Sequence, residues 1–67
     1  MMVTLKAARV NAGLTQKEAA HALGISKSTL ANYEKYRTKP DIEKSVRIAA
    51  LYRLTVDDII FFDTYCA

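Results

Sequence analysis

The sequence predicts an all-α fold, a compact array of five short helices in one domain that spans residues 1–67. Glycine and proline, which end helices and mark turns, number only two and one, which leaves little room for strands and hairpins. Apolar residues recur at helical spacing, and Ser, Thr or Asp precedes each expected helix. A core of this size is marginally stable unless disulfides, a metal or a partner chain support it.

The first two helices have clear start and stop signals. The first is predicted over residues 4–12, with a threonine as its N-cap and Gly13 as the left-handed residue that ends it. The second begins at Thr15, because T-Q-K-E is a capping box in which Thr15 and Glu18 satisfy each other's free backbone amides. Gly24 ends this helix. Its inward stripe should consist of Ala19, Ala20 and Leu23.

The third helix should follow Gly24 after a tight turn. Ser26 is its expected N-cap, and Leu30 and Tyr33 lie at the spacing of a buried side. The next loop, residues 36–40, is polar and basic, and its proline disfavours helix just before itself.

Two further helices complete the predicted array. Asp41 is the expected N-cap of the fourth helix, and Thr55 that of a last, short one. The inward side of the fourth helix should consist of Ile42, Ile48, Ala49 and Tyr52, with Val46 on its flank. The last helix should hold Val56, Ile59 and Ile60.

Residues 16–35 have the layout of a helix-turn-helix, in which the first helix braces the second and the second enters the major groove of DNA. Ala20 supplies the small residue needed where the helices cross. Gly24 supplies the left-handed turn residue at no steric cost. The inward positions of the unit are filled by Ala19, Leu23, Ile25, Leu30 and Tyr33.

The chain resembles the XRE family of helix-turn-helix regulators, which are related to the phage Cro and cI repressors. The resemblance covers Val3 to Phe61 and rests on several spaced motifs. These are L-x-x-x-R at Leu5 and Arg9, G-L-T-Q at 13–16, A-x-x-L-G-I-S at 20–26, S-T-L at 28–30, Y-E at 33–34 and T-K-P at 38–40. The resemblance implies a transcriptional regulator, expected to be a repressor, that binds double-stranded operator DNA as a homodimer.

The resemblance also implies which residues would touch DNA. Lys27, Ser28 and Asn32 fall where the family's recognition helix faces base edges, and Thr29 falls where a hydroxyl reaches base or phosphate. The backbone-contacting positions would be Gln16 in the first turn of the second helix, and Arg37 and Lys39 in the loop after the third.

Some positions concern the fold rather than DNA. Arg9 and Glu34 resemble an internal ion pair that ties the first helix to the end of the third, a structural role. Tyr36 and Arg53 stand where the family often has glycine or another small residue, and Ser45 stands where it usually buries leucine. At Tyr36 we expect either a strained left-handed residue or a different turn.

The last segment differs from the rest of the chain in charge. All ten Lys and Arg lie within residues 1–53, whereas 54–67 contains three Asp and no base. This asymmetry suits a domain whose front meets a polyanion. Residues 55–67, the last helix and its tail, form the expected dimer interface, with the alternative that the tail folds back and completes the core. The expected interface residues are Ile60, Phe61, Phe62 and Tyr65.

A second hypothesis keeps the helix-turn-helix as a scaffold and uses the aromatic tail to bind another protein, as an antitoxin or adaptor would. An enzyme is disfavoured, because no Gly-rich phosphate loop or nucleophile–base pair is present, and His21 with Cys66 is not a metal set. We expect no cofactor, metal or small-molecule ligand. The single cysteine and the lack of a long apolar run favour a cytoplasmic protein without a membrane partner.

Overall fold

The computed structural model describes residues 2–61. It holds four α-helices in this part of the chain: α1 (Leu5–Asn11), α2 (Gln16–Leu23), α3 (Lys27–Glu34) and α4 (Ile42–Leu51). A single 3-10 turn, η1 (Val56–Asp58), follows α4. Two short strands, β1 (Val3–Thr4) and β2 (Ile59–Ile60), pair in parallel. The predicted all-α class is confirmed, with this small strand pair as an addition.

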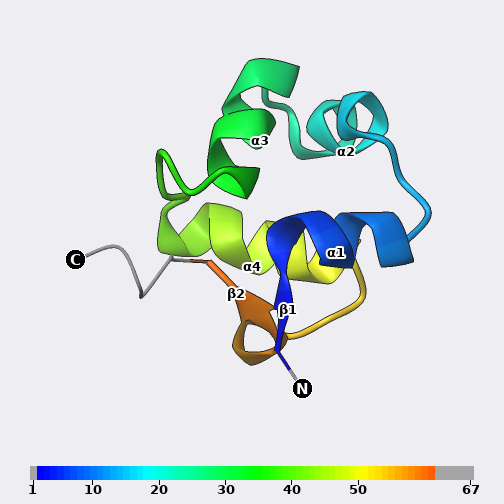
Figure 1. Ribbon diagram of the computed structural model, residues 1–67, viewed down its shortest axis with the longest axis vertical. Coiled ribbons are helices and arrows are strands. Elements are labelled where there is room, and N and C mark those ends of the chain that lie inside the picture. Colours follow the sequence, from blue (N-terminus) through cyan, green and yellow to red (C-terminus); the bar gives the residue numbers. More distant parts are fainter. Residues whose placement is uncertain (1, 62–67) are drawn as a thin grey trace.

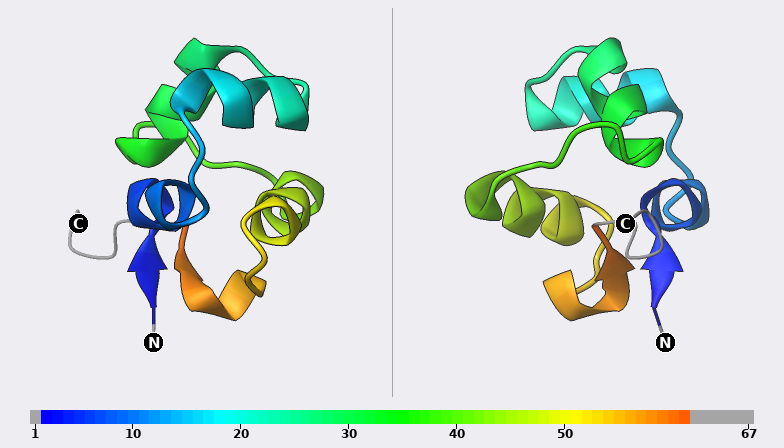
Figure 2. Two further views of the ribbon diagram at one scale, coloured as in Figure 1. Left: turned by 90° about the vertical axis from the view of Figure 1, so that its right-hand side faces the viewer. Right: turned by 60° about the vertical axis from the view of Figure 1, so that its left-hand side comes forward.

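The elements form three levels (Figure 1). Helices α2 and α3 lie together on one side, α1 and α4 lie in the middle, and the strand pair with η1 lies on the opposite side. The side views show the same order (Figure 2). The helix-turn-helix unit is therefore at one end of the molecule, away from the two strands.

Every α-helix begins at the predicted cap. The side chains of Thr4, Thr15, Ser26 and Asp41 each accept a hydrogen bond from the backbone N–H three residues ahead. The capping box at Thr15 is complete, because Glu18 accepts in return from the Thr15 N–H at 2.9 Å. Each such cap contributes about 1 kcal/mol to helix stability. These short helices thus have boundaries fixed by local chemistry.

All four α-helices also end in the same way, on a left-handed residue. These residues are Gly13, Gly24, Tyr36 and Arg53, with φ between 59° and 78°. In each case the next residue donates its N–H to a carbonyl five residues back, for example Ile25 to Ala20 at 3.0 Å. This is the Schellman arrangement. Tyr36 adopts the strained left-handed conformation, the first of the two outcomes expected for it.

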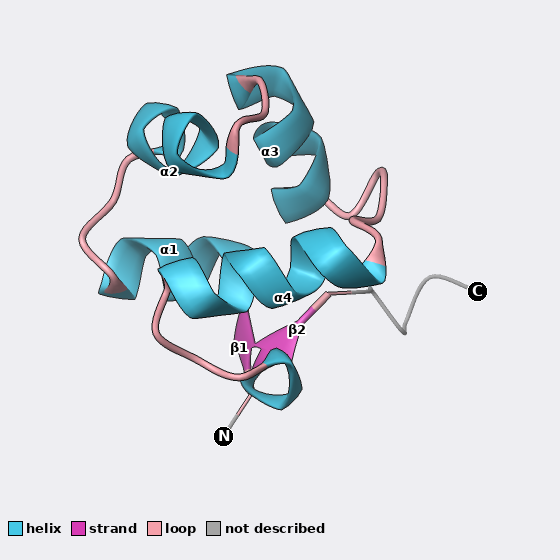
Figure 3. Cartoon of the chain, turned by 180° about the vertical axis from the view of Figure 1, so that it is seen from behind, coloured by secondary structure: helices cyan, strands magenta, loops and turns pink. Residues whose placement is uncertain are grey.

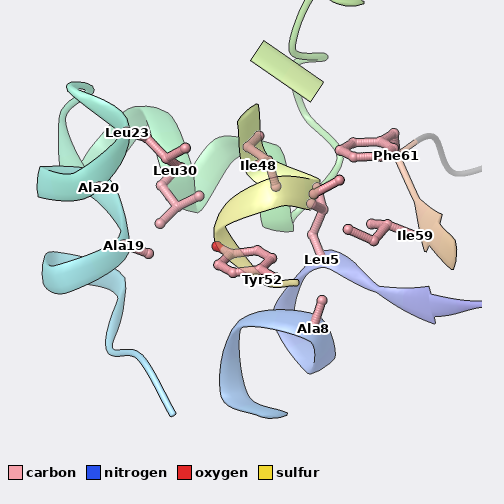
Figure 4. Close-up of a cluster of buried hydrophobic side chains, with 11 residues drawn as sticks. Leu5, Ala8, Ala19, Ala20, Leu23, Leu30, Ile48, Tyr52, Ile59 and Phe61 are labelled. Carbon is pink, nitrogen blue, oxygen red and sulfur yellow. The ribbon is translucent and has the colours of Figure 1, made fainter. Parts of the chain in front are cut away.

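The core is a single cluster between the three levels (Figure 4). Leu5, Leu23, Leu30 and Ile48 are its largest fully buried side chains. Ser45 is also buried and leaves a small polar side chain where the family's leucine would pack. Tyr33 is half-buried and packs against this core, as its inward position predicts. One prediction for an inward residue needs correction, because Ile42, the first residue of α4, is 84% exposed.

The segment after η1 also differs from the prediction. The expected last helix is one 3-10 turn, and Ile59 and Ile60 extend instead to pair with Val3 and Thr4. Phe61 then enters the core and is only 5% exposed, so its assignment to a dimer interface is wrong. Ile60 is half-buried. The other two predicted interface residues, Phe62 and Tyr65, lie outside the described residues.

The Tyr36 hydroxyl holds this extended segment against the start of α1. It donates to the carbonyl of Ile60 at 2.7 Å and accepts a weaker bond from the Leu5 N–H at 3.4 Å. One side chain at the end of α3 thereby joins the start of α1 to β2. A tyrosine in a left-handed conformation costs roughly 1–2 kcal/mol, which this non-local contact offsets.

Tyr52 provides the one buried side-chain hydroxyl without a hydrogen-bond partner among residues 2–61. It is 4% exposed, and its burial, with the nearby charge of Glu34 adding to the effect, raises the pKa of the Tyr52 hydroxyl to about 12. The folded chain therefore keeps the Tyr52 proton at pH values where an unfolded tyrosine loses it.

Replacement by glycine should change the stability of the chain in opposite directions at the two non-glycine left-handed residues. Arg53 is exposed, and Arg53→Gly should raise the free energy of unfolding by about 0.5–1 kcal/mol through relief of its φ of 60°. Tyr36→Gly relieves similar strain but removes the hydroxyl bridge and its packing, so it should lower stability by about 2 kcal/mol or more. Urea denaturation of both variants measures this. Equal stabilisation by the two substitutions would contradict the role given to the Tyr36 hydroxyl.

The decline in stability at alkaline pH should depend on Tyr52. Above pH 10 the unfolded state binds fewer protons than the native state, so stability is intact below pH 10 and declines as pH rises toward 12. Tyr52→Phe should flatten this decline, and should be neutral or stabilising by about 1 kcal/mol at pH 7 because it removes an unpaired buried hydroxyl. Thermal unfolding at pH 7 and pH 10.5 tests both statements. An unchanged alkaline slope in Tyr52→Phe would refute them.

Candidate nucleic-acid interface

The turn between α2 and α3 fixes how the two helices cross. Gly24 adopts φ 71°, and Ile25 packs against the core directly after it. Ala20 of α2 is 3% exposed, as expected for the small residue predicted where the two helices cross. The back of α3 is anchored by Leu30, which is fully buried. Helices α2 and α3 lie together on one side of α1 and α4 (Figure 3), so the side of α3 opposite the buried Leu30 faces away from the core.

The outward side of α3 carries the residues predicted to read bases. Lys27 and Ser28 are exposed, and Asn32 is half-buried. Ser28 and Asn32 are four residues apart and so lie one above the other on the helix. Thr29 is more enclosed, because its hydroxyl lies 2.8 Å from the Ser26 Oγ that also caps its backbone N–H. Lys27, Ser28 and Asn32 therefore have freer polar groups than Thr29.

A buried ion pair stands behind this surface. The Arg9 Nε donates to Glu34 Oε2 at 2.7 Å, and Arg9 Nη2 lies 3.3 Å from Oε1. The Arg9 Nη1 also donates to the carbonyl of Leu14 at 2.8 Å. Both charged side chains are at most 10% exposed. The pair joins α1, the α1–α2 loop and the end of α3.

Glu34 also holds Gln16, a contact that the sequence did not indicate. Gln16 Nε2 donates to Glu34 Oε1 at 3.0 Å, which ties the first residue of α2 to the last residue of α3. An amide nitrogen has two hydrogens, so one donor of Gln16 remains after this bond. The bond therefore fixes the position of the Gln16 side chain, which is predicted to contact a phosphate.

The other two predicted backbone contacts follow α3. Arg37 and Lys39 are exposed on a loop whose end is fixed by the buried Pro40. The Arg37 N–H closes the end of α3 by donating to the carbonyl of Asn32 at 3.0 Å. The loop thus continues the outward side of α3 with two cations.

Positive charge gathers over α2, α3 and this loop. The exposed cations of these segments are Lys17, Lys27, Lys35, Arg37 and Lys39. Two acids lie in these segments: Glu34 is paired with Arg9, whereas Glu18 is exposed and stays ionised, because the Thr15 backbone hydrogen bond lowers the pKa of its carboxyl. The five exposed cations outnumber these two acids. The surface is consequently suited to a polyanion.

Comparison with known proteins agrees with this geometry. The family model described as Helix-turn-helix matches residues 5–59. The regulator ImmR of Bacillus subtilis, named an HTH-type transcriptional regulator, is 41% identical over 56 residues, which are 84% of this chain and 44% of ImmR. An uncharacterized HTH-type transcriptional regulator of Methanothermobacter thermautotrophicus is 36% identical over 64 residues, 94% of this chain and 93% of the relative.

A third relative, MJ0272 of Methanocaldococcus jannaschii, is 30% identical over 59 residues, 88% of this chain and 89% of its own. The chain therefore spans less than half of ImmR and nearly all of the two archaeal proteins. No solved structure matches with comparable significance. Within residues 2–61, no helix has the length and apolar character needed to cross a membrane. The chain belongs to the XRE-type helix-turn-helix family.

Proposed function

We propose that this chain is a sequence-specific regulator of transcription that binds double-stranded operator DNA as a homodimer, with repression as its mode of action in the cytoplasm. The observation that carries the proposal is the outward side of α3. It presents Lys27, Ser28 and Asn32 at one end of the molecule, with cations beside them. The names of the relatives, all HTH-type transcriptional regulators, support the same function.

The exposed side chains of α3 have the chemistry that base reading needs. An asparagine amide pairs with the N6 and N7 of adenine, and a lysine donates to O6 and N7 of guanine. Ser28 adds a hydroxyl that serves as donor or acceptor, and Thr29 a second, partly occupied one. A helix of eight residues such as α3 fits the major groove, which admits an α-helix.

The flanking residues supply the backbone contacts. The second amide hydrogen of Gln16 is available to a phosphate oxygen at the N-terminus of α2, where free N–H groups also favour an anion. Arg37 and Lys39 extend the contact beyond α3. Because Arg9 neutralises Glu34, the Gln16 side chain does not bring a bare carboxylate to the DNA.

The size of the chain supports a dimer. Its principal extents are 31 × 24 × 21 Å, close to the roughly 34 Å of one helical turn of DNA. One copy covers one half-site, and two copies side by side reach two half-sites one turn apart. A two-fold pair of α3 helices would then read a palindromic operator.

The test separates base reading from backbone contact. On duplexes selected from random sequence, Asn32→Ala should lower affinity about 5- to 100-fold for the preferred site and relax preference at one base position. Arg37→Ala should weaken all sequences alike and reduce the salt slope by about one. Fluorescence anisotropy at two salt concentrations measures both.

Arg53→Gly is the matched control for the loss of one positive charge, because Arg53 is exposed and follows α4 in the chain, outside α2, α3 and the loop after α3. It should change duplex affinity less than Arg37→Ala. Absence of duplex binding by the unsubstituted chain at low salt would overturn the proposed function. Equal effects of Asn32→Ala and Arg37→Ala on every sequence would reject the roles given to these two residues.

A further inference from the structure

Helix α4 presents apolar side chains that the core does not use. Ile42 is 84% exposed, Val46 is 52% exposed, and Ala50 is exposed as well. The three are four residues apart in turn, so each is displaced by about 40° from the one before, and they form one continuous stripe along the helix. We call Ile42, Val46 and Ala50 the α4 stripe. Contiguous exposed apolar side chains on a small domain are a candidate surface for an interface.

The acid and the base beside the α4 stripe are placed so that each can pair with the opposite charge of a second copy. Glu43 and Arg47 each follow a stripe residue by one position, about 100° around the helix, so both lie on the same flank and both are exposed. The acid is nearer the N-terminus of α4 and the base nearer the C-terminus. When two such helices pack antiparallel, the same flank of each meets the other, and acid faces base in both directions.

We propose that the α4 stripe is the contact between two copies of this chain, packed antiparallel across a two-fold axis beside Val46. In a two-fold contact, if residue i of one copy contacts residue j of the other, then residue j of the first copy also contacts residue i of the second. Ile42 of one copy then faces Ala50 of the second, and Glu43 comes within reach of Arg47 of the second copy. The inference rests on the homodimer of the proposed function and moves its interface from the tail to α4.

The small size of the stripe sets how strong this contact is. Stable protein interfaces bury about 1,200–2,000 Å² in total, more than three aliphatic side chains from each copy supply. Free copies should therefore associate weakly. Two copies on adjacent half-sites are held at a high effective concentration, so the contact forms on DNA and makes binding cooperative.

Cross-linking at the axis tests the contact directly. A residue on a two-fold axis faces its own counterpart, so Val46→Cys in a Cys66→Ser background should form a symmetric disulfide when two copies occupy a two-half-site duplex. Val10→Cys is the matched control, because Val10 is 56% exposed but lies on α1. We expect the disulfide at position 46 to form at least tenfold faster than at position 10. Equal rates would overturn the proposal.

Charge exchange between copies tests the register. Glu43→Arg and Arg47→Glu, each in the Val46→Cys background, should each slow cross-linking, because like charges then meet across the axis. In an equimolar mixture, the substituted arginine of one copy faces the substituted glutamate of the other, so mixed dimers should form several-fold faster than either like pair. Mass spectrometry distinguishes the three products. An intrachain pair between positions 43 and 47 cannot produce this recovery, and a statistical ratio of products would overturn the register.

A further variant separates this inference from the proposed function. Val46→Gln should bind a single half-site as the unsubstituted chain does and lose cooperativity on two half-sites. If cooperativity persists in Val46→Gln and is lost in Phe62→Ser/Tyr65→Ser, the tail is the interface, so the inference fails and the proposed function stands. If the unsubstituted chain binds no duplex, the proposed function fails, and cross-linking at position 46 in concentrated protein without DNA decides the inference.

Discussion

The buried ion pair between Arg9 and Glu34 is the interaction on which the rest of the structure depends. It is shielded from water on both sides and joins the first helix, the following loop and the end of α3. A pair buried in this way is costly to desolvate and is tolerated only when its remaining polar groups are satisfied. Leu14 and Gln16 provide that satisfaction, at 2.8 Å and 3.0 Å. The same network therefore holds both helices of the helix-turn-helix unit in one arrangement.

Around this network, the residues that face the core and those that face outward meet different demands. Inward positions are determined by packing, as with Leu30 behind α3 and Ile48 within α4, both fully buried. Outward positions are free of that demand. Polar and basic groups occupy the outward side of α3, whereas the outward side of α4 carries an aliphatic row flanked by Glu43 and Arg47. The two surfaces therefore differ in chemistry.

The sequence was sufficient for features that depend on local chemistry. The caps at Thr15 and Ser26 and the left-handed Gly24 involve only neighbouring residues, so the helix boundaries followed directly. Features that depend on distant partners did not follow. The pairing of Ile59 with Val3, and the hydrogen bonds of the Tyr36 hydroxyl to Leu5 and Ile60, join residues more than twenty positions apart. The periodicity of α4 also could not tell whether its first residue faces the core, because a residue at the N-terminus of a helix has no preceding helical turn beside it.

The most direct test of the account replaces both members of the ion pair with apolar residues. In Arg9→Met/Glu34→Leu the free energy of unfolding should stay within about 2 kcal/mol of the unsubstituted chain, since apolar replacement of a whole buried pair is often neutral. Duplex affinity should nevertheless fall at least tenfold, because Gln16 loses the carboxylate that holds it and α3 loses its tie to α1. Unchanged affinity in this folded variant would show that the pair does not position the DNA-reading surface.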